Sequence, residues 1–178
     1  MLLADALSEL GAIDLARNRC QTAEQYLRDA IRAAVEIPDP SVQPEATERL
    51  ARCLLSQGRN LQAERELVGA LPLLHIAGDP VAGPDLFVTL AEVYYQTNRR
   101  QAGVTVLSFS ASLASSIGSV PYPVMANCMD RCESELRQAL PASEFDPAWN
   151  EGAALTIDQT IANALTALDR EVAHEDLS

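Results

Sequence analysis

Apolar residues between positions 46 and 70 recur at the spacing expected of two α-helices. One apolar face comprises Leu50, Ala51, Leu54 and Leu55, and a second, further along the chain, comprises Ala63, Leu67 and Ala70. Gly58 separates the two faces, and glycine suits the left-handed conformation that ends many helices. The segment is therefore predicted to form a hairpin of two helices.

This pattern returns with a period of 40 residues. Equivalent positions within the first helix carry leucine, at Leu10, Leu50 and Leu90. The position after that helix carries asparagine or glycine and precedes an arginine, at Asn18, Gly58 and Asn98. A fixed period of about 20–50 residues is typical of a solenoid. We therefore expect helical repeats over about residues 1–40, 41–80 and 81–120, with a degenerate repeat over 121–140.

Prolines separate the predicted hairpins. Pro44 and Pro84 are equivalent in the repeat, and each is followed by an acidic residue, Glu45 or Asp85. Proline in the first turn with a carboxylate beside it is typical of a helix N-terminus. Both prolines are therefore predicted to begin a helix, and we assign no catalytic role to the linkers.

The composition favours helices over strands. Of 178 residues, 48% are hydrophobic but only 4% are aromatic, so the core must consist mainly of Ala, Leu and Val. Small side chains allow helices to approach closely, whereas β-sandwiches favour aromatic and β-branched residues. The predicted fold class is all-α, and the length fits one domain better than two.

The chain is strongly acidic. It contains 25 Asp and Glu residues against 13 Lys and Arg residues, which gives a formal net charge of -12. Because an acidic surface repels phosphate groups, direct nucleic-acid binding by this segment is not expected.

The four cysteines are expected to be reduced. Cys128 and Cys132 are the closest pair, and neither His75 nor His174 lies near them in sequence. A metal site would need further ligands, so we interpret the pair as small core residues and expect no metal and no cofactor. The sequence shows neither a signal peptide nor an apolar stretch long enough to span a membrane, which indicates a cytoplasmic protein.

No motif of a catalytic site is present in the sequence. We find no P-loop, glycine-rich dinucleotide loop, zinc-protease motif or nucleophile elbow. His75 is expected near the end of a helix, in a capping or packing role. We therefore predict that the protein is not an enzyme, because catalysis would have to reside in Cys128, Cys132 and His75.

The repeats resemble tetratricopeptide repeats. The third repeat matches that pattern at Phe87, Leu90, Ala91, Tyr94, Asn98, Gly103, Leu107 and Ser110. The second matches it at Thr47, Leu50, Ala51, Leu54, Gly58, Ala63, Leu67 and Ala70. The resemblance implies a right-handed α-solenoid of helix hairpins. Because the period exceeds the usual ~34 residues, helical repeats of the HEAT type are a structural alternative.

The C-terminal third resembles the last segment of large bacterial signal-transduction ATPases. These include LuxR-type and maltose-regulator-like activators and ATPase-linked nucleotidyl cyclases. The resemblance covers about residues 105–168 and is carried by residues such as Phe145, Trp149, Gly152 and Leu155. It implies a helical sensor region whose ATPase and output domains lie in other parts of a longer chain.

Residues 141–178 are predicted to form a C-terminal capping segment. Residues 156–159 read as a capping box that begins a final helix, and Asp146 is expected to cap the helix before it. The final helix is predicted to have an apolar face of Ile157, Ile161, Ala164, Leu165 and Leu168. We interpret Phe145 and Trp149 as anchors that fold this helix onto the last repeat.

The first predicted helix carries apolar residues on more than one face. They are Leu2, Leu3, Leu7, Leu10, Ile13 and Leu15. A terminal repeat normally has a polar outer side. We therefore expect the sequence to be an excised domain or a fragment of a longer chain.

In a tetratricopeptide register, the first helix of each hairpin lines the concave side of the solenoid. The candidate partner-binding residues on that side are Leu15, Glu45, Glu48, Arg52, Leu55, Asp85, Val88, Glu92, Tyr95 and Gln96. Leu15, Leu55 and Tyr95 form an apolar line, which suits either an apolar peptide or contact with the neighbouring repeat. Asp5, Glu45 and Asp85 form an acidic line, which suits either a basic ligand or the helix N-termini themselves.

These features predict a non-catalytic helical-repeat module that senses or docks a protein, a peptide or a small-molecule effector. The module would be the C-terminal part of a bacterial transcriptional or signalling regulator. The alternative is a free-standing tetratricopeptide adaptor with no ATPase attached. The sequence pattern assigns no oligomeric state.

Overall fold

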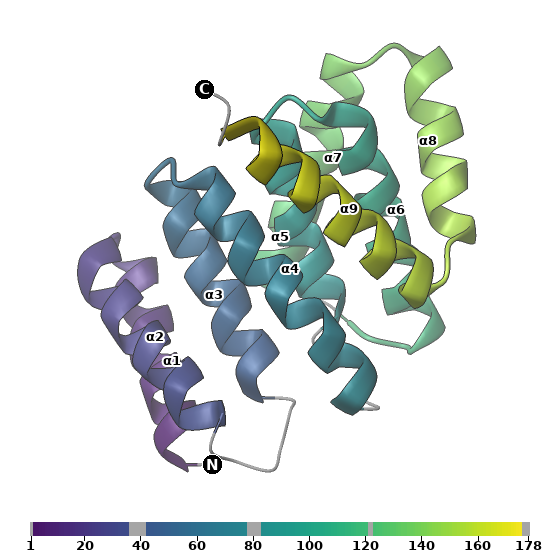
Figure 1. The fold of residues 1–178 in the computed structure, drawn as a ribbon. Coiled ribbons are helices and arrows are strands. Elements are labelled where there is room, and N and C mark those ends of the chain that lie inside the picture. Colours follow the sequence, from purple (N-terminus) through teal and green to yellow (C-terminus); the bar gives the residue numbers. More distant parts are fainter. Residues whose placement is uncertain (1, 36–41, 78–82, 121–122, 176–178) are drawn as a thin grey trace. The chain divides into compact units, whose positions relative to one another are not determined.

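The structure, a computed structural model, describes residues 2–35, 42–77, 83–120 and 123–175 (Figure 1). Every regular element in these ranges is an α-helix, so the predicted all-α class is confirmed. The helices are α1 (Leu2–Ala16), α2 (Cys20–Val35), α3 (Val42–Ser56), α4 (Asn60–Ala77), α5 (Gly83–Gln96), α6 (Arg100–Ser116), α7 (Pro123–Ala139), α8 (Ala142–Ala154) and α9 (Ile157–Glu175). None of these described helices has the length and apolar character that a bilayer span requires.

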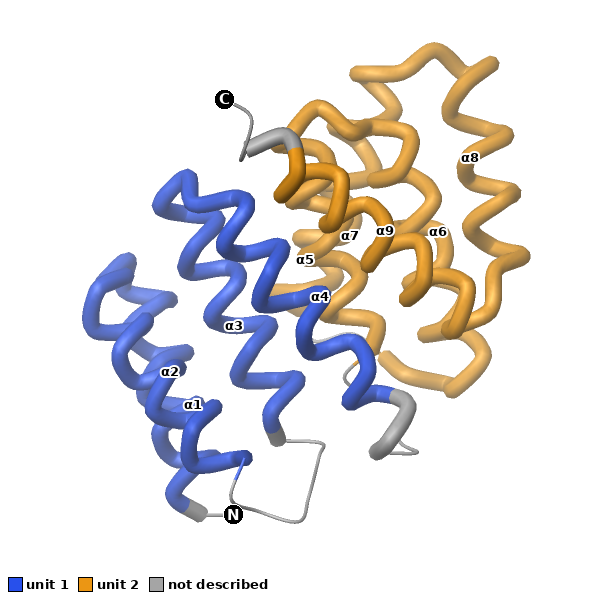
Figure 2. Tube along the Cα trace, in the orientation of Figure 1, with its two compact units in different colours: residues 1–82 blue, residues 83–178 orange. Residues whose placement is uncertain are grey.

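The chain divides into two compact units, residues 1–82 and residues 83–178 (Figure 2). The division falls between the second and third predicted repeats. The first unit contains α1 to α4 and the second contains α5 to α9.

The first unit consists of two helix hairpins, α1–α2 and α3–α4, with α3 packed against both α1 and α2. Its core is made almost entirely of alanine and leucine. The fully buried side chains include Ala23, Leu27, Ala30, Leu50, Ala51, Leu54, Ala63 and Leu67. Because alanine adds little width, the helix backbones can approach closely at these positions.

The turns between paired helices repeat the same backbone geometry. Their left-handed residues are Asn18 (φ 58°), Gly58 (φ 73°) and Asn98 (φ 63°). The next amide donates to a carbonyl of the preceding helix, from Arg19 to Asp14 (2.8 Å), from Arg59 to Leu54 (3.0 Å) and from Arg99 to Tyr94 (2.8 Å). These are Schellman motifs. The prediction that Asn18, Gly58 and Asn98 end the first helices is confirmed.

Both predicted proline starts are also confirmed. Pro44 lies in the first turn of α3 and Pro84 is the second residue of α5. Glu45 and Asp85 lie in the same first turns, where a carboxylate is favourable near the positive end of the helix dipole.

In the second unit, α5 and α6 form a hairpin, α7 packs against both of them, and α8 packs against α6. Small polar residues on α6 face α8. The Ser108 hydroxyl donates to the Trp149 carbonyl oxygen (2.6 Å) and the Ser112 hydroxyl donates to the Ala153 carbonyl oxygen (3.3 Å). The backbone of α8 is therefore held directly against α6.

The start of α8 differs from the sequence prediction. The helix begins at Ala142, after Pro141, so the expectation that Asp146 caps it is wrong. Pro147 lies inside α8, and the residue four positions before it, Ser143, is exposed. Water can hydrate the Ser143 carbonyl, so the missing proline N–H does not end the helix there.

The capping box at the start of α9 is confirmed. The Thr156 amide donates to Gln159 Oε1 (2.9 Å), and the Gln159 amide donates to Thr156 Oγ1 (3.3 Å). The buried face of α9 is rotated from the predicted one, because Thr160 and Ala164 are each 1% exposed whereas Leu165 is 42% exposed.

Phe145 and Trp149 stack on each other, with ring centroids 5.6 Å apart. Phe145 is buried and Trp149 is half-buried. The Arg137 guanidinium of α7 lies over the Phe145 ring, 4.0 Å from its centroid. These two rings therefore join α8 to α7 through a cation–π contact.

Candidate functional site

The candidate residues of the first unit lie on α1 and α3. Glu45 is exposed, and Leu15 and Arg52 are half-buried. Glu48 and Leu55 are buried, with 6% and 7% of their surfaces exposed. Glu48 lies beside Arg52, with 3.8 Å between Glu48 Oε1 and Arg52 Nε. The first unit therefore offers a partner the surface of Glu45 and parts of Leu15 and Arg52.

Arg49 connects the two helices that carry these residues. Its Nη1 donates to the Ser8 hydroxyl (2.7 Å), and its Nη2 lies 2.7 Å from Glu45 Oε1 and 2.9 Å from Glu9 Oε1. Ser8 and Glu9 belong to α1, whereas Glu45 and Arg49 belong to α3. Glu45 and Glu9 therefore share one cation, and the three side chains together keep a net negative charge.

Arg49 was not among the candidate residues predicted from the sequence. The sequence feature that points to Arg49 is its position four residues after Glu45, a spacing typical of an ion pair along one helix. The contacts of Arg49 with Ser8 and Glu9 depend on the packing of α1 against α3, so the residues next to Arg49 in sequence do not predict them.

The candidate residues of the second unit lie on α5. Val88 is buried, Gln96 is exposed, and Asp85, Glu92 and Tyr95 are half-buried. The one fully exposed residue of this set, Gln96, is therefore the last residue of α5, and Asp85, Glu92 and Tyr95 are partly accessible.

Glu92 of α5 makes an ion pair with Arg131 of α7, and this contact between two helices was not predicted from the sequence. Its Oε1 accepts a hydrogen bond from Arg131 Nη2 of α7 (2.9 Å) and another from Gln96 Nε2 (3.5 Å). Coulombic attraction by Glu92 raises the pKa of the Arg131 guanidinium above its usual value, although burial acts in the opposite direction. The Glu92 carboxylate is therefore already paired with a cation.

The two lines of residues proposed from the sequence are distributed over both units. In the apolar line, Leu55 is buried while Leu15 and Tyr95 are half-buried. In the acidic line, Asp5 lies in the first turn of α1, as Glu45 and Asp85 do in α3 and α5. The ten candidate residues therefore form two separate groups, one in each unit.

The cysteines lie mainly in packed surroundings. Cys132 is 2% exposed, and burial raises the pKa of its thiol to about 12. Met125 and Leu136 of the same helix, α7, are buried as well, and Cys128 is half-buried. The part of the chain that the structure describes contains no group of three or more His, Cys, Asp or Glu side chains placed to hold a metal ion. The side chain of His75 lies outside the described residues.

The chain is similar to known proteins over part of its length. No family model matches the chain, and no solved structure matches it. Over 81 residues, the chain is 32% identical to proteins from Mycobacterium bovis and Mycobacterium tuberculosis whose names contain the words "HTH-type transcriptional regulator". The matched part covers 46% of this chain but only 9% of each relative.

Proposed function

We propose that this chain is a non-catalytic helical-repeat module that docks a protein or peptide partner within a bacterial transcriptional regulator. The observation that supports the repeat is the shared left-handed turn at Asn18, Gly58 and Asn98, each with an equivalent backbone hydrogen bond. The observation that supports the regulator is the partial similarity to proteins with HTH-type regulator names.

Repetition of one hairpin favours a binding role. Stacked hairpins present the first helix of each pair on a shared face, which suits an extended or helical peptide. The finer proposal is that the hairpins form a right-handed α-solenoid of the tetratricopeptide type, and the 40-residue sequence period supports it. The net charge of -12 favours a segment that contacts a partner and leaves DNA contact to other parts of the regulator.

Tyr95 is the residue we select to test partner binding. It lies on a first helix, α5, and is half-buried, so it combines a fixed position with an accessible ring. Tyrosine is frequent among the residues that dominate protein interfaces. Leu55 is less suitable, because a charge at this buried position would destabilise the fold itself.

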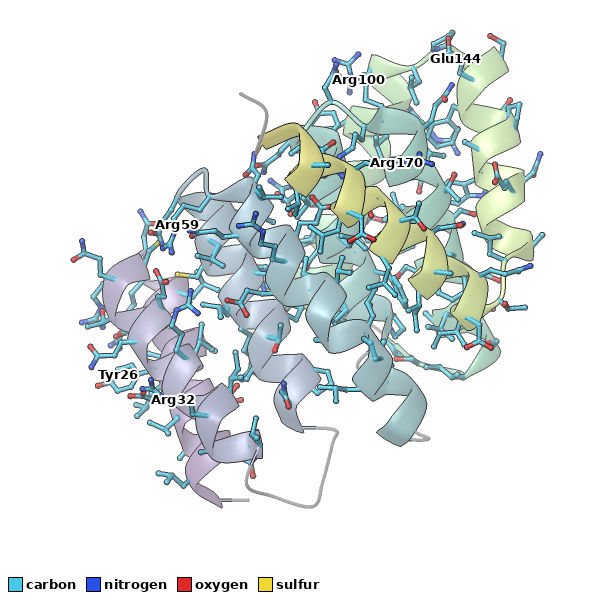
Figure 3. All side chains as sticks on the ribbon, viewed as in Figure 1. Tyr26, Arg32, Arg59, Arg100, Glu144 and Arg170 are labelled. Carbon is cyan, nitrogen blue, oxygen red and sulfur yellow. The ribbon has the colours of Figure 1, made fainter. Side chains whose placement is uncertain are left out.

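The experiment uses two matched tyrosine variants of the whole chain. Tyr26 is also half-buried but lies on a second helix, α2 (Figure 3). Partners captured by the wild type are identified by mass spectrometry, and their affinity is then measured by titration. We expect Tyr95→Ser to weaken binding about tenfold, or about 1.4 kcal/mol, and Tyr26→Ser to leave it unchanged. Equal effects of both variants, or no saturable partner, would contradict the proposal.

A further inference from the structure

A cavity of about 190 Å³ lies in the second unit between α6 and α9. Residues from α5, α6, α8 and α9 line it. The two positions of α9 that are most buried, Thr160 and Ala164, both line this cavity, and both have small side chains. Because these small side chains do not fill the gap between α9 and α6, a space remains between the two helices.

The cavity has apolar walls of a size that suits one ring. Val106, Ala164 and Tyr94 contribute buried apolar surface to it. An apolar cavity of about 150 Å³ is large enough for a benzene molecule. The observed volume therefore fits a ring that carries a short aliphatic arm.

The threonine hydroxyls beside the cavity accept hydrogen bonds, whereas the Asn163 amide and the Tyr94 hydroxyl, which also line it, contain hydrogen-bond donors as well. The Thr105 hydroxyl donates its hydrogen to the Gln101 carbonyl oxygen (3.1 Å), and the Thr160 hydroxyl donates to the Thr156 carbonyl oxygen (3.0 Å). Each hydroxyl oxygen therefore has lone pairs but no further hydrogen to offer. Glu151, which is exposed, adds a carboxylate, and the described lining residues include no Lys, Arg or His.

We propose that this cavity binds a small primary amine with an apolar body, of which an arylalkylamine is the simplest form. A protonated amine supplies hydrogen-bond donors to the Thr105 and Thr160 oxygens and a positive charge to Glu151, and its ring contacts the apolar walls. The inference goes beyond the proposed docking function by adding a small-molecule effector to the second unit. Binding itself is measured on the purified chain and requires no protein partner.

The first experiment compares two probes of similar shape and opposite charge. Phenethylamine and phenylpropionate are titrated separately into the 178-residue chain, and binding is followed by NMR chemical-shift changes. We expect saturable binding of phenethylamine, with the shifts concentrated at Val106, Thr160 and Ala164. Equal binding of phenylpropionate, or no saturable binding of the amine, overturns the inference.

Three variants on α9 locate the site. Ala164→Leu fills the cavity and is expected to abolish amine binding, whereas Ala162→Leu changes an exposed position of the same helix and is expected to preserve it. Ala167→Leu is a second filling variant, and thermal unfolding by circular dichroism shows which variants are folded. Unchanged amine binding in a folded filling variant overturns the assignment of the site.

A fourth variant tests the role of charge. Glu151→Gln is expected to weaken phenethylamine binding roughly two- to fivefold, because an exposed carboxylate is partly screened by water. The neutral probe phenylethanol is expected to bind equally to both proteins. A result in which amine affinity does not change contradicts the cation preference. Failure of any of these tests leaves partner capture through Tyr95 unaffected, so the two proposals are distinguishable.

Discussion

Gly152 determines how closely α8 approaches α6. A β-carbon added at this position would collide with the Thr105 carbonyl oxygen and lie 3.0 Å from the Ser108 β-carbon. The colliding atom belongs to the backbone of α6, which cannot move as a side chain can. The hydrogen bonds from Ser108 and Ser112 to the α8 backbone depend on the same close approach.

We predict that Gly152→Ala destabilises the protein by about 1–3 kcal/mol, because the added methyl group overpacks the contact between α6 and α8. The matched control is Gly69→Ala in α4, where a β-carbon would meet nothing within 4 Å. There alanine is expected to stabilise by about 0.5–1 kcal/mol through its higher helix propensity. Denaturant unfolding measures both values, and the same sign for the two variants would be incompatible with this account.

Glu24 lies between two arginines of the first unit. Its Oε1 is 3.0 Å from Arg28 Nη2 and its Oε2 is 2.5 Å from Arg59 Nη1, and Arg28 also contacts Glu66 of α4 (3.0 Å). Burial raises the pKa of the Glu24 carboxyl, but the hydrogen bonds and charges of Arg59 and Arg28 outweigh burial and hold the pKa below its usual value of 4.5.

This lowered pKa predicts how stability depends on pH. A carboxyl whose pKa is lower in the folded state stabilises fully above its unfolded pKa, and this contribution is lost as the pH falls through the folded value. The unfolding temperature of Glu24→Gln is therefore expected to lie below that of the wild type near neutral pH. The difference should shrink as the pH falls below 4.5 and disappear once the pH is below the lowered pKa of the folded state. Circular dichroism melts across this range provide the check, and a difference that is constant with pH would refute the prediction.

At the scale of the element, the hairpin of α3 and α4 depends on a small residue where the helices face each other. Ala63 is fully buried in α4, and its amide donates to the Arg59 carbonyl oxygen in the first turn after Gly58. Leu50, Ala51 and Leu54 of α3 are buried too. The turn fixes the register of the two helices, and alanine permits their close packing.

Ala63→Leu is expected to destabilise by about 1–3 kcal/mol, because the larger side chain must displace neighbours in a packed core. Gln62→Leu makes the change at the adjacent exposed position, where little loss of stability is expected. Thermal unfolding of the pair tests the register of α4. If both variants melt like the wild type, Ala63 does not lie in the helix contact.

Local signals explain which elements could be predicted from the sequence. The ends at Asn18, Gly58 and Asn98 and the capping box at Thr156 depend on a few neighbouring residues, and all are confirmed. The start of α8 was missed because proline, which usually ends or begins a helix, is tolerated inside it beside an exposed turn.

In the candidate sites, too, contacts within one helix are visible in the sequence, whereas contacts between helices are not. The Glu45–Arg49 ion pair was not predicted, although its i, i+4 spacing is visible in the sequence, whereas the contacts of Arg49 with Ser8 and of Arg131 with Glu92 join separate helices. The cavity beside Thr160 depends on the distance between α6 and α9, which no sequence period specifies.

At the scale of the whole molecule, the 40-residue period extends through both compact units. The units divide at residue 82, within the repeat pattern rather than at its end. The last residues of α1, α3 and α5, which are Ala16, Ser56 and Gln96, are equivalent in the repeat, and all three are exposed. These positions can therefore report on the geometry of the whole array without disturbing its core.

A solenoid predicts equal steps between these positions. Nitroxide labels are attached in pairs to cysteines placed at Ala16, Ser56 and Gln96 after the four native cysteines are replaced by serine. Adjacent helices pack about 8–10 Å apart. We therefore expect the distance between labels at positions 16 and 56 to equal that between positions 56 and 96. The distance between positions 16 and 96 should approach twice this value. Electron paramagnetic resonance gives the distances. A 16–96 distance as short as the single steps would indicate a closed bundle, in which the repeated hairpins share no extended face and the proposed docking surface does not exist.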